Sequence, residues 1–151
     1  MTKILFVCHG NICRSPMAEF VFKKLVQDEK LENYFYIESA ATSREEIGND
    51  IHPGTKEKLR EKNIPFTKRK ARQIKKEDYK NFDLLIGMDS ENKKNMLRFW
   101  GDDSDKKIFN LLEFAGLKTD IADPWYTGNF DDTLNDILKG CRALLKNLSW
   151  P

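Results

Sequence analysis

The stretch CHGNICRSP, residues 8–16, sets the arrangement of the rest of the chain. It directly follows the apolar run of residues 3–7 (KILFV), which is typical of a buried strand that enters a turn. Ser is a favoured helix N-cap and Pro is tolerated at the first helical position, so we expect a helix that opens at Ser15-Pro16 with Ser15 as its N-cap. Four apolar residues then recur at helical spacing and predict the inner face of this helix: Met17, Phe20, Val21 and Leu25.

Strand-like and helix-like segments alternate along the rest of the chain. We expect three further strands, at residues 36–40, 83–88 and 107–111, and helices from Pro53 onward and over residues 90–100. One apolar stripe predicts a last helix: Leu134, Ile137, Leu138, Cys141, Leu145 and Leu148. The alternation predicts an α/β fold, with a four-stranded parallel sheet flanked by helices on both faces and a phosphate-binding loop after the first strand.

Length and composition limit the class of protein. The 151 residues show no internal repeat or linker, so we expect residues 1–151 to form a single domain. Hydrophobic residues at 40% exclude a disordered chain, and a formal net charge of +2 gives no reason to expect a nucleic-acid partner. No apolar run approaches the ~20 residues of a membrane span, and the N-terminus lacks the pattern of a secretory signal. We therefore expect a cytoplasmic protein without a membrane partner. The basic stretch of residues 56–76 is interpreted as a solvated face rather than a docking surface.

The cysteines and histidines predict neither a disulfide framework nor a metal centre. Three cysteines cannot all pair, and the closeness of Cys8 and Cys13 to Arg14 favours reactive thiol chemistry in a reducing compartment. His9 and His52 show no metal-ligand spacing. We therefore expect no metal and no cofactor.

The residues of the loop point to an anion-binding site. A loop that closes on a helix start turns backbone N–H groups, which have no intrahelical partner, toward a common centre. Gly10 allows close approach of the backbone, and Arg14 supplies a planar fork for two phosphate oxygens. Helix N-termini and nearby cations favour a thiolate over a thiol, so we expect Cys8 to be an ionised nucleophile. Ser15 can donate to that thiolate and Asn11 can hold the loop, which would stabilise phosphoryl transfer without a metal.

Longer stretches of the sequence resemble a known family. The segment VCHGNICRSPMAE closely resembles the signature of the low-molecular-weight protein tyrosine phosphatases, and the similarity continues in order through SAATS, ARQI, KED, FDLLIGMD and ADPWY. The resemblance covers nearly the whole chain and implies a four-stranded parallel sheet. It further implies an enzyme that hydrolyses phosphotyrosine in proteins, and small aryl phosphates, through a phosphocysteine intermediate and releases inorganic phosphate. We expect a monomer, although the sequence does not show whether the chain dimerises.

The resemblance assigns roles to individual residues. It implies that Cys8 is the nucleophile, that Arg14 binds the phosphoryl group, and that Asp123 is first general acid and then general base. The loop would bind the phosphate through His9, Gly10, Asn11, Ile12, Cys13 and Ser15. Trp125 and Tyr126 would form an aromatic wall against the substrate ring, and Phe35 would stand at the opposite lip, with core packing the competing interpretation for these three aromatics.

Several neighbouring residues keep two interpretations. Ser39 and Asp89 match family positions that support the loop, but both are also ordinary strand-end residues. Cys13 either forms a reversible disulfide with Cys8 under oxidation or packs behind the loop. Cys141 lies on the last apolar stripe and is expected in the core.

Two positions depart from the family pattern. His9 replaces a residue that is often apolar, and on the rim it would alter substrate preference. Lys62 stands where we expect many relatives to carry a histidine that supports the loop, which puts that part of the network in doubt.

Three other functions share the predicted anion site. Protein arginine phosphatases resemble this chain but carry Thr where Ile12 stands, so Ile12 and Trp125 favour phosphotyrosine. A thioredoxin-coupled arsenate reductase needs two further cysteines, and residues 84–91 contain none. A phosphocysteine carrier or a simple phosphate-binding module would not need Asp123-Pro124 followed by aromatic residues.

Overall fold

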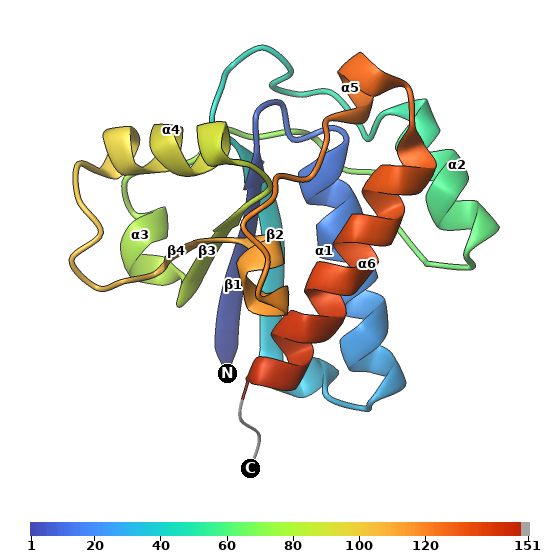
Figure 1. The fold of residues 1–151 in the computed structure, drawn as a ribbon, viewed down its shortest axis with the longest axis horizontal. Helices are drawn as coiled ribbons and strands as arrows, with labels where there is room; N and C mark the ends of the chain where they lie inside the picture. The colour runs from blue at the N-terminus through green and yellow to red at the C-terminus, as the bar shows by residue number, and fades with distance from the viewer. Residues whose placement is uncertain (149–151) are drawn as a thin grey trace.

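The computed structural model describes residues 1–148 and has the predicted α/β architecture (Figure 1). Its elements are β1 (Thr2–Cys8), α1 (Arg14–Asp28), η1 (Glu32–Tyr34), β2 (Phe35–Ala41), α2 (Pro53–Glu61), α3 (Asp78–Asn81), β3 (Leu84–Gly87), α4 (Ser90–Trp100), β4 (Ile108–Asn110), η2 (Leu111–Ala115), α5 (Pro124–Thr127) and α6 (Phe130–Asn147). The four strands are all parallel and lie in the order β2-β1-β3-β4. The prediction of a four-stranded parallel sheet is therefore confirmed.

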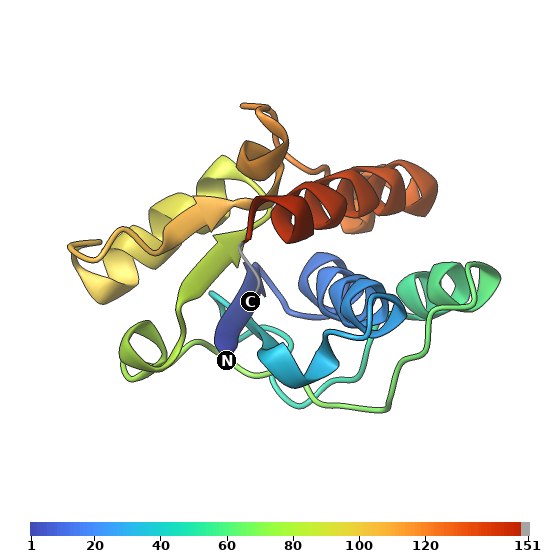
Figure 2. The same cartoon turned by 90° about the horizontal axis from the view of Figure 1, so that it is seen from below.

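Helices cover both faces of the sheet, as predicted. In Figure 2, α1, α2 and α6 lie on one side of the strands, and α3 and α4 lie on the other. The side chains of β1 alternate between these two layers because successive residues of a strand point to opposite faces. Ile4, Phe6 and Cys8 join the larger core with residues of α1 and α6, whereas Leu5 and Val7 join the smaller core with Met96 of α4 and its neighbours. Because β1 lies between the two helix layers, its apolar run is buried on both faces.

The start of the first helix differs from the prediction. Helix α1 begins at Arg14 with Cys13 as its N-cap, and no side chain caps it. The expected N-cap, Ser15, is instead fully buried, and its hydroxyl lies 3.0 Å from the Cys8 sulfur. Pro16 is tolerated because the N–H groups of the first helical turn have no intrahelical partner. The prediction that Ser15 caps the helix was therefore wrong: its hydroxyl bonds to the loop.

Four short helices were missed by the sequence analysis: η1, α3, η2 and α5. Each spans five residues or fewer, which is too short for a helical hydrophobic period to show. The longer elements agree with the prediction to within a few residues, and the predicted helix over residues 90–100 matches α4. The last apolar stripe lies on α6, where Leu134, Ile137 and Cys141 are almost completely buried.

The strand order fixes where a ligand can bind. From β1 the chain passes to β2 on one side and later to β3 on the other, so the connections diverge at the carboxyl end of β1. In open α/β sheets, ligands bind at such a switch point, outside the carboxyl ends of the strands. The segment of residues 8–13, the segment of residues 42–52 and helix α5 all gather at this end, which is the upper end in Figure 1.

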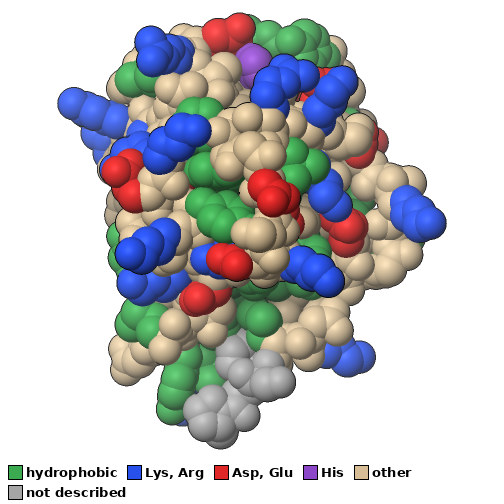
Figure 3. Space-filling view, turned by 90° about the vertical axis from the view of Figure 1, so that its left-hand side faces the viewer, with side chains coloured by type: hydrophobic (Ala, Val, Ile, Leu, Met, Phe, Trp, Pro, Cys, Tyr) green, Lys and Arg blue, Asp and Glu red, His purple; other side chains and the backbone are tan. Residues whose placement is uncertain are grey.

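The outer surface carries charges of both signs. Over α3 and α4, Lys and Arg side chains are interspersed with Asp and Glu (Figure 3). Several cations of the basic stretch 56–76 form ion pairs, including Lys56 with Asp50 and Arg72 with Asp78. Because Asp78 is buried, the interpretation of the whole stretch as a solvated face does not hold at Arg72. Within residues 1–148, the structure contains no helix with the length and apolar character of a membrane span.

Candidate active site

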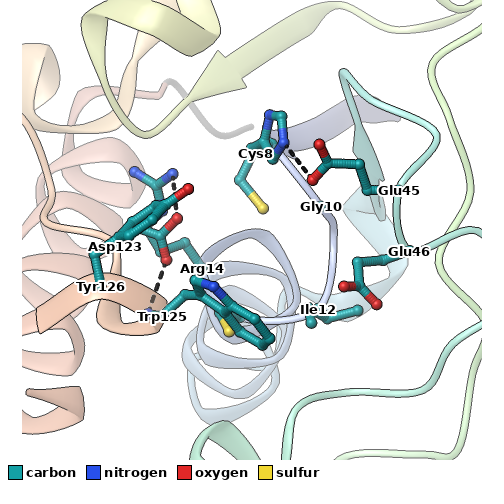
Figure 4. Close-up of a pocket in the computed structure, with 11 residues that line it drawn as sticks. Cys8, Gly10, Ile12, Arg14, Glu45, Glu46, Asp123, Trp125 and Tyr126 are labelled. Atoms are coloured by element: carbon teal, nitrogen blue, oxygen red, sulfur yellow. Dashed lines mark hydrogen bonds and ion pairs between the residues drawn. The ribbon is translucent and has the colours of Figure 1, made fainter. Parts of the chain in front are cut away.

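A pocket opens at the carboxyl end of β1, over the start of α1 (Figure 4). It is lined by Cys8, His9, Gly10, Ile12, Cys13, Arg14, Glu45, Glu46, Asp123, Trp125 and Tyr126. These residues come from the segment between β1 and α1, from the segment between β2 and α2, and from the start of α5. The pocket therefore unites parts of the chain that are separated by more than one hundred residues.

The sulfur of Cys8 receives hydrogen bonds from several donors. The backbone N–H groups of Asn11 and Ser15 lie 3.3 and 3.4 Å from Sγ, and the Ser15 hydroxyl lies 3.0 Å from it. Asn11 Nδ2 donates to Ser15 Oγ at 2.8 Å, which leaves the hydroxyl hydrogen of Ser15 for the sulfur or for the Ala40 carbonyl, 3.5 Å away. Donors of the loop and of the first turn of α1 therefore lie around the sulfur.

Backbone N–H groups from outside the loop bond to the loop carbonyls and thereby orient the loop peptides. The carbonyl oxygens of Cys8 and His9 accept from the N–H groups of Thr42 and Ser43, at 2.9 and 3.1 Å. The Ile12 carbonyl accepts from His52 N at 2.9 Å. All described peptide bonds are trans, so the N–H of each following residue points opposite to these carbonyls. The segment after β2 therefore fixes the orientation of the loop peptides from outside the loop.

Asn11 occupies the one strained position of the loop. Its φ is 59°, in the left-handed region that Asn tolerates better than most residues. The completely buried side chain donates to Ser15 Oγ and Ser39 Oγ, at 2.8 and 2.9 Å, and its Oδ1 accepts from Arg72 N at 3.3 Å. Three hydrogen-bonding atoms therefore hold the Asn11 side chain in place. Gly10 serves a different purpose, since a Cβ there would lie 3.2 Å from Glu46 Cγ.

Arg14 is buried beneath the pocket among carboxylates. Its NH1 donates to Asp89 Oδ2 at 2.7 Å and to the Ile121 carbonyl at 2.9 Å, and its NH2 lies 3.5 Å from Asp123 Oδ2. Burial alone would lower the pKa of Arg14, but the charges of Cys8, Asp89 and Asp123 raise it above its ordinary value. A guanidinium has five N–H donors, so donors remain for a bound anion after Asp89 has fixed its orientation.

Asp123 lies at the same pocket, as the resemblance implied. It is the N-cap of α5, where its Oδ1 accepts from Trp125 N at 3.0 Å. Pro124 opens this short helix and fixes the backbone that presents the carboxylate. With 23% of its side chain exposed, Asp123 can reach both a ligand and water.

Trp125 and Tyr126 form one wall of the pocket, and Figure 4 places them on the same side as Asp123. Both are solvent-exposed, at 58% and 82%, so they are not core residues. Trp125 contacts the ring of His52 edge-on at 5.8 Å, and His52 also stacks on Phe130. This contact supports the aromatic wall from behind.

Phe35 does not form the opposite lip, so that prediction is wrong. It is the first residue of β2 and pairs with Thr2, at the other end of β1 from Cys8. Seven strand residues separate these ends by roughly 20 Å. The Phe35 ring is 6% exposed and packs edge-on against Phe22 in the core. The lip opposite the aromatic wall is formed instead by Glu45 and Glu46, which the sequence analysis did not single out (Figure 4).

Both proposed supporting residues contact the site. Ser39 Oγ accepts from Asn11 Nδ2 and donates to Glu19 Oε1 at 2.6 Å. Asp89 holds Arg14 and also caps α4 through Asn92 N at 2.7 Å. Neither is merely a strand-end residue.

The sequence left the support of the loop at Lys62 in doubt, and the structure places Arg69 there behind the loop. Lys62 is exposed after the end of α2, whereas Arg69 lies behind the loop and donates from NH2 to the Asn11 carbonyl at 2.7 Å. Burial lowers the pKa of Arg69, an effect that the nearby charges of Glu19 and Cys8 oppose. Its NH1 is buried without a hydrogen-bond partner among residues 1–148. No local pattern marks Arg69, because it lies in an irregular segment of many basic residues.

The other cysteines differ from Cys8 in their surroundings. Cys13 lines the pocket, and burial, together with the charges of Cys8 and Asp123, raises the pKa of its thiol to about 12. Cys141 is fully buried against α1, and burial raises the pKa of its thiol as well. Within residues 1–148, no group of His, Cys, Asp and Glu side chains is placed to hold a metal ion.

This geometry defines a class: α/β proteins that bind an anion in a strand–loop–helix cradle around a cysteine sulfur. The sequence model described as "Low molecular weight phosphotyrosine protein phosphatase" matches residues 3–150. The chain belongs to this family, and it is therefore a phosphatase, a phosphoric monoester hydrolase.

Individual relatives agree with the family assignment. The chain is 40% identical to the low molecular weight protein-tyrosine-phosphatase YfkJ of Bacillus subtilis, over 98% of this chain and 96% of that protein. The crystal structure of YfkJ superposes with a TM-score of 0.92 and covers 97% of this chain and 93% of that chain. The crystal structure of SP-PTP from Streptococcus pyogenes, which is 42% identical, superposes with a TM-score of 0.90 and covers 99% of this chain and 95% of that chain. The drosophila arginine phosphatase DARP has the same fold at 28% identity, with a TM-score of 0.87 and coverage of 97% and 96%.

We expect thiol alkylation to distinguish the three cysteines. A pH of 7 is about five units below the Cys13 pKa of about 12. Almost all of the Cys13 thiol is therefore protonated, and it reacts slowly. Iodoacetamide followed by peptide mass spectrometry should therefore modify Cys8 first, and inorganic phosphate should protect Cys8. Modification of Cys13 or Cys141 at the rate of Cys8 would contradict the assignment.

We also expect Arg69→Met to weaken anion binding. Loss of the guanidinium frees the Asn11 carbonyl and with it the Ile12 N–H, and a hydrogen bond from a charged donor is worth about 1.5–3 kcal/mol. Calorimetric titration with phosphate or vanadate should show a loss in affinity of about tenfold or more. Lys68→Met, which removes a charge from an exposed neighbour, is the matched control and should change affinity by less than about twofold. Equal effects of the two substitutions would show that Arg69 acts only through net charge.

Proposed function

We propose that the chain hydrolyses phosphotyrosine in proteins, and small aryl phosphates, through a phosphocysteine intermediate on Cys8. The observation that carries this proposal is the single pocket that contains the Cys8 sulfur, the Arg14 guanidinium and the Asp123 carboxylate. Nucleophile, phosphate ligand and proton donor are the groups that such a displacement needs.

In the first step, the Cys8 thiolate attacks phosphorus and the bond from phosphorus to the phenolic oxygen breaks. Asp123 transfers its proton to the departing oxygen, which leaves as tyrosine. Charge spreads over the three equatorial oxygens, where the loop amides and Arg14 stabilise it. The buried ion pair of Arg14 with Asp89 supports this role, because it holds the guanidinium in place before substrate arrives.

In the second step, the Asp123 carboxylate takes a proton from water while the water oxygen attacks phosphorus. The bond from phosphorus to sulfur breaks, and inorganic phosphate leaves. The returning thiolate is stabilised by Ser15, whose hydroxyl lies 3.0 Å from Sγ, and by the N–H groups of Asn11 and Ser15. No metal or cofactor enters this cycle.

The walls of the pocket support phosphotyrosine over phosphoserine. Trp125 and Tyr126 stand above the cradle and offer aromatic surface to a ring. A phosphoserine stem is too short to span these walls and still bring its phosphate to the Cys8 sulfur, whereas a phenyl ring supplies the missing length.

Phosphoarginine is the second candidate substrate. The observation that favours it is the acidic lip of Glu45 and Glu46, which could pair with a guanidinium, together with the likeness to the drosophila arginine phosphatase. Ile12 stands where the arginine phosphatases carry Thr, which favours phosphotyrosine.

We expect leaving-group dependence to reveal the role of Asp123. Asp123→Ala should slow the hydrolysis of aryl phosphates with poor leaving groups by about 10²-fold or more, and those with good leaving groups far less, because only a poor leaving group needs the proton. Asp120→Ala is the matched control, since Asp120 binds Ser90 rather than the pocket. Equal losses for all leaving groups would refute the general-acid role.

In Cys8→Ser, turnover should be abolished while phosphate or vanadate still binds.

A side-by-side assay separates the candidate substrates. Phosphate release from matched phosphotyrosine, phosphoserine and phosphoarginine peptides should give the highest kcat/KM for phosphotyrosine, by about tenfold or more over the others. A preference for phosphoarginine would transfer the proposal to the second candidate. A phosphocysteine that forms but does not turn over would indicate a carrier.

A further inference from the structure

The mouth of the pocket has two chemically different walls. Trp125 and Tyr126 form the aromatic wall, and Glu45 and Glu46 form what we call the acidic lip on the other side, as Figure 4 shows. Glu45 has 70% of its side chain exposed, so its carboxylate faces the solvent from which a substrate arrives. The proposed chemistry at Cys8 uses neither glutamate.

The acidic lip is held against the loop by its own segment. Ser43 N and Oγ both donate to the His9 carbonyl, at 3.1 and 2.9 Å. Farther along, Gly48 N donates to Ala71 O at 2.9 Å. Gly10 lets the lip lie close, because a Cβ there would meet Glu46 Cγ at 3.2 Å. The backbone that carries the two glutamates is therefore held at the mouth.

Neither glutamate of the lip is neutralised by a Lys or Arg of residues 1–148. Glu45 Oε2 pairs with His9 Nε2 at 2.9 Å, and Glu46 Oε2 accepts from the neutral Asn49 amide. The adjacent Arg44 donates to Gln73 at 3.3 Å instead of turning to the lip.

The charges that line the pocket are mainly negative. Arg14 is the single Lys or Arg among the lining residues, and it already pairs with Asp89 and Asp123. In a bound phosphopeptide, the phosphotyrosine ring would fill the pocket and the peptide backbone would cross its mouth. The negative charge of the mouth therefore lies beside that backbone.

We propose that the acidic lip selects phosphotyrosine segments in which a Lys or Arg stands next to the phosphotyrosine, and disfavours segments with Asp or Glu there. This inference rests on the proposed function, because it takes phosphotyrosine as the substrate of the same pocket. A basic side chain beside the phosphotyrosine pairs with Glu45 or Glu46 and can also lie over the face of Trp125 or Tyr126. An acidic side chain brings like charges together at the mouth.

The expected preference follows from the strength of exposed ion pairs. One such pair changes an equilibrium by up to about fivefold, so two glutamates should discriminate a Lys-flanked from a Glu-flanked peptide by roughly 5–25-fold. The effect should be largest near 0.01 M salt, where the screening length is ~30 Å, and should nearly vanish at 1 M, where it is ~3 Å.

The test compares two phosphotyrosine peptides that differ only in the residues next to the phosphotyrosine, Lys in one and Glu in the other. The ratio of their kcat/KM values should fall toward one in Glu45→Gln/Glu46→Gln and should invert in Glu45→Lys/Glu46→Lys. Glu29→Gln/Glu32→Gln removes the same charge from exposed residues between α1 and β2, near the strand end that lies opposite Cys8, and should leave the ratio unchanged. A ratio in the unaltered protein that already equals one at low salt, or that favours the Glu peptide, would overturn the proposal.

A binding measurement separates this inference from the proposed function. Calorimetry measures the affinities of both peptides for Cys8→Ser without turnover. Because the peptides differ only in the flanking residues, the ratio of the two affinities reports on the lip. If the peptides bind with the expected discrimination but the unaltered protein releases no phosphate from them, the proposed function fails and the inference stands. If phosphate is released but neither affinity nor kcat/KM depends on the flanking charge, the glutamates are only solvated rim residues and the inference fails.

Discussion

The structure depends on the orientation of a few peptide groups between β1 and α1. Their carbonyls are held outward by donors from other parts of the chain, and the N–H groups of Asn11 and Ser15 donate to the Cys8 sulfur. The strand ends at this loop and the helix begins from it, which places the strained Asn11 and the buried Arg14 at fixed points. A loop without these outside partners would have no reason to keep the convergent arrangement, because parallel N–H dipoles repel one another when no anion is bound.

Burial gives the charges of the site their strength and also makes them costly. Arg14 is almost completely buried, and a buried guanidinium requires partners; Asp89, Asp123 and the Ile121 carbonyl provide them. Arg69 is a second guanidinium behind the loop and is half-buried; its NH1 has no hydrogen-bond partner among residues 1–148, and burial lowers its pKa. Removing such a charged group from water lowers the stability of the folded protein. Its hydrogen bond to the Asn11 carbonyl is the favourable contact that this placement allows. Two cations on opposite sides of one loop make the region favourable for an anion even though three carboxylates line the pocket.

The interior and the mouth of the pocket serve different purposes. Inside, the cradle, Arg14 and Asp123 can act on the phosphate of any substrate that reaches them. At the mouth, Trp125 and Tyr126 form an aromatic wall and Glu45 and Glu46 an acidic lip, which in the proposed function select the shape of the entering group and the charge beside it. The mouth residues come from an irregular segment and a four-residue helix, whose sequence can vary without disturbing the sheet. The chemistry and the choice of substrate are therefore carried by separate parts of the fold.

The sequence by itself determined the features that arise from neighbouring residues. The apolar run before Cys8, the spacing of Cys8 and Arg14, and the stripe of α6 predict a strand, an anion loop and a helix, because period and capping are local properties. The position of Asp123 came from resemblance, and spacing alone could not supply it. Only the tertiary structure decided that Arg69 supports the loop, that Glu45 and Glu46 replace Phe35 at the lip, and that Ser15 bonds to the sulfur instead of capping the helix. These contacts join residues brought together by crossovers between parallel strands, and the register of such strands is set by the packing of the whole sheet and not by any segment of the chain.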